Sequence, residues 1–120
     1  MAYDNSTARL LEALETRDPR RLRSALAVGA QLVHDSGTAA GGIHRGRRRV
    51  VTQLLALVPA GVTVHGAAVN AADGIVLVAP DGAVCGVLAL EGGPRGVTRV
   101  WASTSAEKLR GWVRPGSSDA

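Results

Sequence analysis

Asp35 is the residue of this sequence best suited to act as a general base. It follows Gln31-Leu32-Val33-His34, at the end of a predicted strand. A carboxylate at the mouth of an apolar cavity has a raised proton affinity and can move protons. The other interpretation is a turn residue whose carboxylate accepts hydrogen bonds from the backbone of Ser36 and Gly37. The residues alone leave both open.

The histidines offer a second catalytic candidate but no metal site. His65 lies mid-strand between two small or apolar neighbours and is predicted to assist Asp35, or else to be a hydrogen-bonded sheet histidine. His34 is adjacent to Asp35, so the two side chains project from opposite strand faces and cannot form a dyad in one pocket. The histidines and Cys85 lack metal-ligand spacing, and no phosphate-binding loop or dinucleotide glycine pattern occurs. We therefore expect no metal and no cofactor.

A run of arginines at residues 47–49 is the main charged feature. Arg47 and Arg48 are predicted to bind an anion together with the start of a helix. The alternative is a solvated helix face, where each cation opposes the helix dipole at a cost of about 0.3–1 kcal/mol. Nucleic acid is not an expected partner, because it usually requires aromatic platforms or a recognition helix. The chain has two Trp, one Tyr and no Phe.

Length and composition predict one globular domain. The 120 residues are 46% apolar, and the core must be built from Val, Leu, Ala and Ile. The net charge of +4 comes almost entirely from arginine, as in high-GC bacterial coding sequences. One cysteine excludes an intrachain disulfide. We expect no membrane span and no signal peptide, and hence a cytoplasmic location.

Two periodicities divide the chain. Helical spacing and capping signals predict helices over residues 5–16, from Asp18-Pro19 to Gly29, and over 46–58. Residues 36–42 are expected to form a loop. Strands are predicted at 30–35, 62–70, 74–79, 84–90 and 97–102, and the Thr104–Glu107 capping box predicts a short C-terminal helix. Both faces of strand 84–90 are apolar, so one face should pack on helices and the other on a second copy of the chain, as a homodimer.

Residues 69–112, "VNAADGIVLVAPDGAVCGVLALEGGPRGVTRVWASTSAEKLRGW", resemble a known family. A VNG-type turn, a DG hairpin, a V-G-V-L-A strand and an NPDKL-like segment, here Ser105–Leu109, are similar to the SnoaL-like C-terminal domain of extracytoplasmic-function sigma factors. "LVHDSGTAAGG", starting at Leu32, is in the place of that family's DGGGK loop but lacks its lysine. Gly46-Arg47 resembles the G-R-x-x-V start of the third helix. No sigma-factor domain precedes the segment, so we expect a free-standing relative.

The resemblance implies the fold class of the nuclear-transport-factor-2-like (NTF2-like) superfamily. This is a cone-shaped α+β fold, with a curved antiparallel sheet packed on three N-terminal helices and a short C-terminal helix. It implies one domain over residues 1–113 and a flexible tail over 114–120. An apolar cavity would bind a small apolar ligand through six predicted residues: Val33, Leu54, Val58, Val69, Leu88 and Trp101.

The leading functional hypothesis is a non-enzymatic protein, either a binder of a small apolar ligand or a regulatory, partner-binding module. The alternative is an isomerase, cyclase or hydrolase of a hydrophobic metabolite. It would use Asp35 as general base, as in the similar segment of ketosteroid isomerases, with His65 assisting. The oxyanion partner of that chemistry is missing, because Tyr3 precedes the first helix. A third hypothesis is a dimerisation module whose cavity is filled by side chains.

Overall fold

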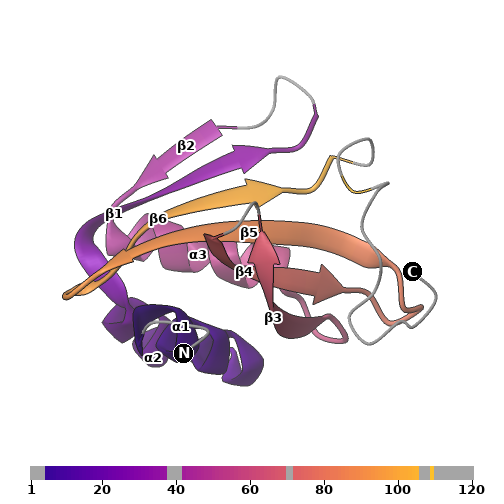
Figure 1. The fold of residues 1–120 in the computed structure, drawn as a ribbon, viewed down its shortest axis with the longest axis horizontal. Helices are drawn as coiled ribbons and strands as arrows, with labels where there is room; N and C mark the ends of the chain where they lie inside the picture. The colour runs from indigo at the N-terminus through magenta and orange to yellow at the C-terminus, as the bar shows by residue number, and fades with distance from the viewer. Residues whose placement is uncertain (1–4, 38–41, 70–71, 106–108, 110–120) are drawn as a thin grey trace.

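The computed structural model describes residues 5–37, 42–69, 72–105 and 109. In this part of the chain, three helices cover one face of a curved, open, six-stranded sheet (Figure 1). The helices are α1 (Asn5–Thr16), α2 (Pro19–Ala25) and α3 (Arg47–Leu57). The strands are β1 (Leu26–Asp35), β2 (Gly42–Arg45), β3 (Thr63–Val69), β4 (Ala72–Val78), β5 (Val84–Gly93) and β6 (Gly96–Ser103). The predicted α+β fold class is confirmed.

The sheet order is β2-β1-β6-β5-β4-β3, so the last strand in sequence, β6, lies between β1 and β5. Four of the five pairings are antiparallel, as predicted. The β1–β6 pairing is parallel, which makes the sheet mixed rather than antiparallel throughout. The difference arises because β6 returns to β1 from the far end of the chain, and no turn signal in the sequence reports that contact.

The second helix ends earlier than predicted. Its start is as expected: Asp18 is the N-cap, its carboxylate accepts a hydrogen bond from the Arg20 amide, and Pro19 is the first helical residue. Leu26 is already extended, with φ −100° and ψ 143°. Gly29 is therefore not the helix stop. It has φ +84° and lies between Leu26 and Gln31, where the β1–β6 register shifts. Figure 1 shows that β1 bends near its start.

Strand β2 was not predicted, because its glycine-rich surroundings resemble a loop. It pairs with β1, placing Ile43 beside Val33 and His44 beside Leu32. The predicted C-terminal helix and the predicted tail over residues 114–120 lie almost wholly outside the described residues. Only the Leu109 amide is described there, and it donates to the Ser105 carbonyl at 3.0 Å.

The core lies between the helices and the concave side of the sheet, and aliphatic side chains fill it. Leucines of all three helices, such as Leu14, Leu22 and Leu54, are 0% exposed and belong to one cluster with strand residues such as Leu32 and Leu88. Because the sequence has no phenylalanine, smaller aliphatic side chains fill the core through many small contacts.

Arg17 joins the helical layer to the start of β3. It has φ +54°, which is uncommon for a residue with a side chain. Its guanidinium donates to the carbonyl oxygens of Val58 at 3.0 Å, Pro59 at 3.0 Å and Val62 at 2.6 Å. These three bonds connect the α1–α2 corner to the segment between α3 and β3, and they satisfy carbonyls left at the end of α3.

Candidate functional site

The sheet face opposite the helices carries an apolar row. Four residues are successive cross-strand partners on that face and form what we call the outer row: Ile43, Val33, Trp101 and Ala89. Ile43 is 56% exposed and Trp101 is 41% exposed. Cross-strand partners on one face touch each other. The row is therefore a continuous apolar strip with two large side chains open to solvent.

Charged residues of opposite sign border the outer row. On one side, Gln31 pairs with both Arg45 and Arg99, and Arg99 pairs with Glu91. The Arg99 guanidinium carbon is 5.3 Å from the centroid of the Trp101 ring, within cation–π range. On the other side, Asp35 is two residues beyond Val33 and shares its face. The strip is thus bordered by two arginines and a glutamate on one side and a carboxylate on the other.

Asp35 makes the contacts that the turn interpretation predicts. Its Oδ1 accepts a hydrogen bond from the Gly37 amide at 3.0 Å. Its carbonyl accepts one from the Thr104 amide at 3.0 Å. The register places its side chain on the outer face, away from the core between sheet and helices. The carboxylate therefore stabilises the turn that follows β1.

The structure does not bring Asp35 and His65 together. The pairings run Asp35–Ser103–Val87–Val76–His65, so the two side chains share a face but lie four strands apart. At the usual strand spacing this is roughly 19 Å along the sheet. A direct acid–base pair between them is excluded in this conformation.

Each of two histidines has a hydroxyl partner. His65 Nε2 is 3.0 Å from Thr63 Oγ1, and His34 Nε2 is 2.9 Å from Thr104 Oγ1. His34 is on the opposite sheet face from Asp35, as its adjacent position predicts. Both histidines therefore take part in local hydrogen bonds of the sheet.

The six predicted ligand-binding residues divide between two faces. Leu54, Val58 and Leu88 are 0–1% exposed and belong to the core cluster. Val33 and Trp101 belong to the outer row. The backbone of Val69 ends β3, and its side chain lies outside the described residues. The five described side chains therefore do not line one cavity.

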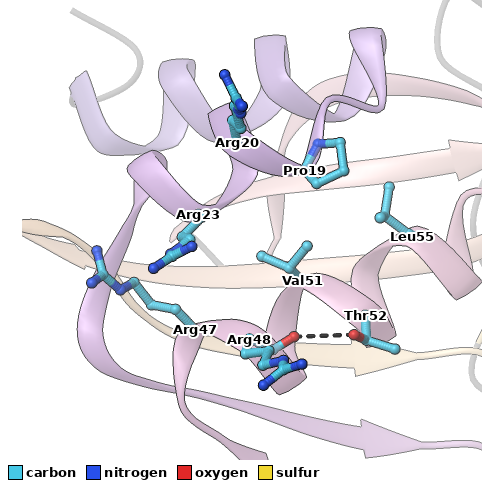
Figure 2. Close-up of a pocket in the computed structure, with 8 residues that line it drawn as sticks. All are labelled: Pro19, Arg20, Arg23, Arg47, Arg48, Val51, Thr52 and Leu55. Atoms are coloured by element: carbon cyan, nitrogen blue, oxygen red, sulfur yellow. Dashed lines mark hydrogen bonds between the residues drawn. The ribbon is translucent and has the colours of Figure 1, made fainter.

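Arg47 and Arg48 do lie at a hollow, between α2 and α3, which we call the arginine cleft (Figure 2). It has a volume of about 690 Å³, and its lining residues are Pro19, Arg20, Arg23, Arg47, Arg48, Val51, Thr52 and Leu55. Arg20 and Arg23 were not predicted from the sequence to bind an anion. Their i, i+3 spacing shows that they share a helix face, but only the packing of α2 on α3 shows what that face meets.

Cys85 and the remaining metal-ligating residue types form no further site among the described residues. Burial raises the pKa of the half-buried Cys85 thiol, and its Sγ lies 3.6 Å from the Leu77 carbonyl oxygen. Throughout the described ranges, no group of three or more His, Cys, Asp or Glu side chains could hold a metal ion. None of the described helices is long and apolar enough to cross a membrane.

No protein-family model matches this chain, and no curated protein does either. Solved structures do. The chain is 22% identical to the extracytoplasmic-function sigma factor SigJ of Mycobacterium tuberculosis, with a TM-score of 0.65; the match covers 92% of this chain and 45% of SigJ.

A SnoaL-like protein of unknown function from Burkholderia thailandensis is 19% identical, with a TM-score of 0.58, and the match covers 80% of this chain and 88% of that one. A protein with a ketosteroid-isomerase-like fold from Catenulispora acidiphila is 13% identical, with a TM-score of 0.59 and 88% of each chain covered. The three helices on a curved sheet are thus the SnoaL-like, NTF2-like fold that the sequence resemblance predicted.

Proposed function

Within this SnoaL-like fold, we propose that the chain is a non-enzymatic, partner-binding module that pairs with a second copy of itself through the outer row. The observation that carries the proposal is the exposure of Ile43 and Trp101 on one apolar strip. Large exposed apolar side chains that adjoin one another mark interaction surfaces, whereas isolated ones do not.

The charges beside the row favour a second copy as the occupant. Two sheets that pack face to face lie about 10 Å apart with their strands aligned to within about 30°. With the two-fold axis along the outer row, Asp35 of one copy comes to lie opposite Gln31 of the other. That position is between Arg45 and Arg99 in the register. The carboxylate then meets two guanidinium groups, and the symmetry repeats the contact.

The burial of Leu54, Val58 and Leu88 supports partner binding over the predicted small apolar ligand. These side chains pack on one another and on the helices, so a ligand there would have to displace core contacts. The separation of Asp35 from His65 likewise ranks the isomerase alternative lower. The similarity to SigJ supports a regulatory use of this fold, because the matched part makes up 45% of a sigma factor. The cytoplasm remains the expected location.

Light scattering on the purified chain tests the proposal. We expect the mass of a dimer, and the mass of a monomer for Trp101→Glu. Val28→Glu is the matched control, because Val28 is 83% exposed but lies in the bend of β1, outside the outer row. The control variant should stay dimeric. A monomeric wild-type chain, or equal dissociation of both variants, would reject the proposal.

Charge reversal tests the orientation of the two copies. Asp35→Arg and Arg99→Glu should each weaken the dimer, because each places like charges opposite each other. The double variant should restore part of the affinity, measured as the dimer dissociation constant by analytical ultracentrifugation. Additive losses in the double variant would show that the two residues do not meet across the interface.

A further inference from the structure

We propose that the arginine cleft binds a small amphipathic anion, with a carboxylate or phosphate head group and an apolar body. This site lies on the helical side of the molecule. It is separate from the outer row and does not depend on the dimer. The inference rests on the charge of the cleft, its apolar wall, its size and the arrangement of its side chains.

Four arginines line the cleft, and within the described residues their guanidinium groups have no acidic partner. Within the described ranges, the one ion pair joins Arg21 to Asp18 at 3.7 Å, and neither residue lines the cleft. No side-chain hydrogen bond is found for the guanidinium groups of Arg20, Arg23, Arg47 and Arg48 in that part of the chain, unlike those of Arg9 and Arg17. Like charges collected in one hollow repel each other, and an anion removes that repulsion.

The part of the cleft wall that is not formed by arginines is mainly apolar. Val51 is 8% exposed, Leu55 is half-buried, and the Pro19 ring lies across from them on α2. Thr52 turns its hydroxyl to its own helix, donating to the Arg48 carbonyl at 3.1 Å. A volume of about 690 Å³ is within the usual range of small-molecule pockets, about 300–1,000 Å³. A bare inorganic ion would leave most of this space and the apolar wall unused.

The side chains divide the cleft into two ends. Figure 2 shows Arg23 and Arg47 at one end, with their guanidinium groups extending into the same region, and Pro19 and Leu55 at the other, with Val51 between. A planar guanidinium donates two parallel hydrogen bonds to a carboxylate or phosphate. The structure thus places the head group between Arg23 and Arg47 and the apolar body along Val51 and Leu55. No aromatic side chain lines the cleft to stack a nucleobase.

Calorimetric titration with three naphthalene compounds tests the ligand class. We expect 2-naphthyl phosphate or 2-naphthoate to bind, and neutral 2-naphthol to bind at least tenfold more weakly, because it cannot accept charge-assisted hydrogen bonds from two guanidinium groups. The tighter of the two anions identifies the head group. Inorganic phosphate alone should bind more weakly than the naphthyl ester, because it makes no apolar contact.

Paired variants test the location. Arg23→Gln with Arg47→Gln should lower the affinity at least tenfold. Arg21→Gln with Arg49→Gln is the matched control, because it removes the same charge from the same two helices at positions that do not line the cleft. Its effect should stay within about twofold, the general effect of net charge. Leu55→Asn should weaken the naphthyl anions but leave inorganic phosphate unchanged.

Three results would overturn the inference. Equal binding of 2-naphthol would show apolar adsorption without anion recognition. Equal loss of affinity in the two paired variants would show attraction to overall positive charge. A DNA duplex that binds more tightly than both anions and responds to the cleft variant would show that the cleft serves a nucleic acid instead.

Discussion

Arg17 and the arginines of the arginine cleft are the same residue type in opposite situations. The Arg17 guanidinium donates to three carbonyl oxygens at 2.6–3.0 Å. The cleft arginines line an open hollow, where Arg23 and Arg47 extend their guanidinium groups into the same region (Figure 2). A satisfied arginine stabilises the fold that contains it, whereas arginines gathered without acidic partners destabilise it slightly. The difference separates the arginines that build this molecule from those available to bind something else.

Removing Arg17 should have the largest effect on stability. Arg17→Met removes the guanidinium donor from three carbonyl oxygens; the Pro59 carbonyl keeps the Val62 amide at 3.1 Å, and Val58 and Val62 are buried. We expect the free energy of unfolding to fall by about 2–4 kcal/mol, measured by urea denaturation. Arg17→Lys should fall between wild type and Arg17→Met, because an ammonium group cannot reach all three oxygens at once. A loss below about 0.5 kcal/mol for Arg17→Met would mean that water replaces the guanidinium freely.

Removing cleft arginines should have the opposite effect and raise the free energy of unfolding. Arg47 and Arg48 occupy the first turn of α3, whose N-cap is Gly46 with no side-chain cap. Cations there oppose the helix dipole, so Arg47→Gln with Arg48→Gln should raise the free energy of unfolding by about 0.3–1 kcal/mol per residue in low salt. The gain should shrink in high salt. A loss of stability would show that these arginines have a structural partner and would weaken the comparison with Arg17.

Arg9 provides an intermediate case with the smallest expected effect. Its Nη2 donates to the Ser24 carbonyl at 2.8 Å and to the Ser24 hydroxyl at 2.9 Å, both at the surface. Because water can replace exposed partners, Arg9→Gln should lower the free energy of unfolding by about 0.5–1 kcal/mol. The same urea titration measures it. A loss as large as that of Arg17→Met would show that the burial of the acceptors does not set the size of the effect.

Sequence patterns predicted those helices and strands whose formation depends on residues close together in the chain. Helical spacing located α1 and α3, and the predicted turn at Asp81-Gly82 lies between β4 and β5. The turn predicted at Asp73-Gly74 is wrong, because both residues belong to β4 and pair with Ala68 and Ala67 of β3. Strand β2 and the early end of α2 were not predicted. Both depend on β1: β2 forms by pairing with β1, and α2 ends where β1 begins. The parallel β1–β6 contact joins segments about 70 residues apart, and periodicity carries no information about such a pairing.

The sequence predicted which residue types could form the candidate sites better than it predicted where those residues lie in the fold. Arg47 and Arg48 were recognised from their run, but Arg20 and Arg23 join them only through helix packing. Alternation showed that Val33 and Asp35 share a strand face. It did not show that this face is the outer one, away from Leu54 and Leu88. Face assignment requires knowing which side of the sheet the helices cover, and that is a tertiary property.

The place of β6 in the sheet has a consequence for how the chain folds during synthesis. Residues 26–45 form the β1–β2 pair and residues 63–93 form the β3–β5 meander, and neither borders the other until β6 lies between them. Synthesis must therefore reach the end of β6, at Ser103, before the two parts of the sheet can be joined. Such long-range pairing slows folding. Until then the unpaired edges of β1 and β5 are open to pairing with the strands of other nascent chains, a route to aggregation that the finished sheet closes at these two edges.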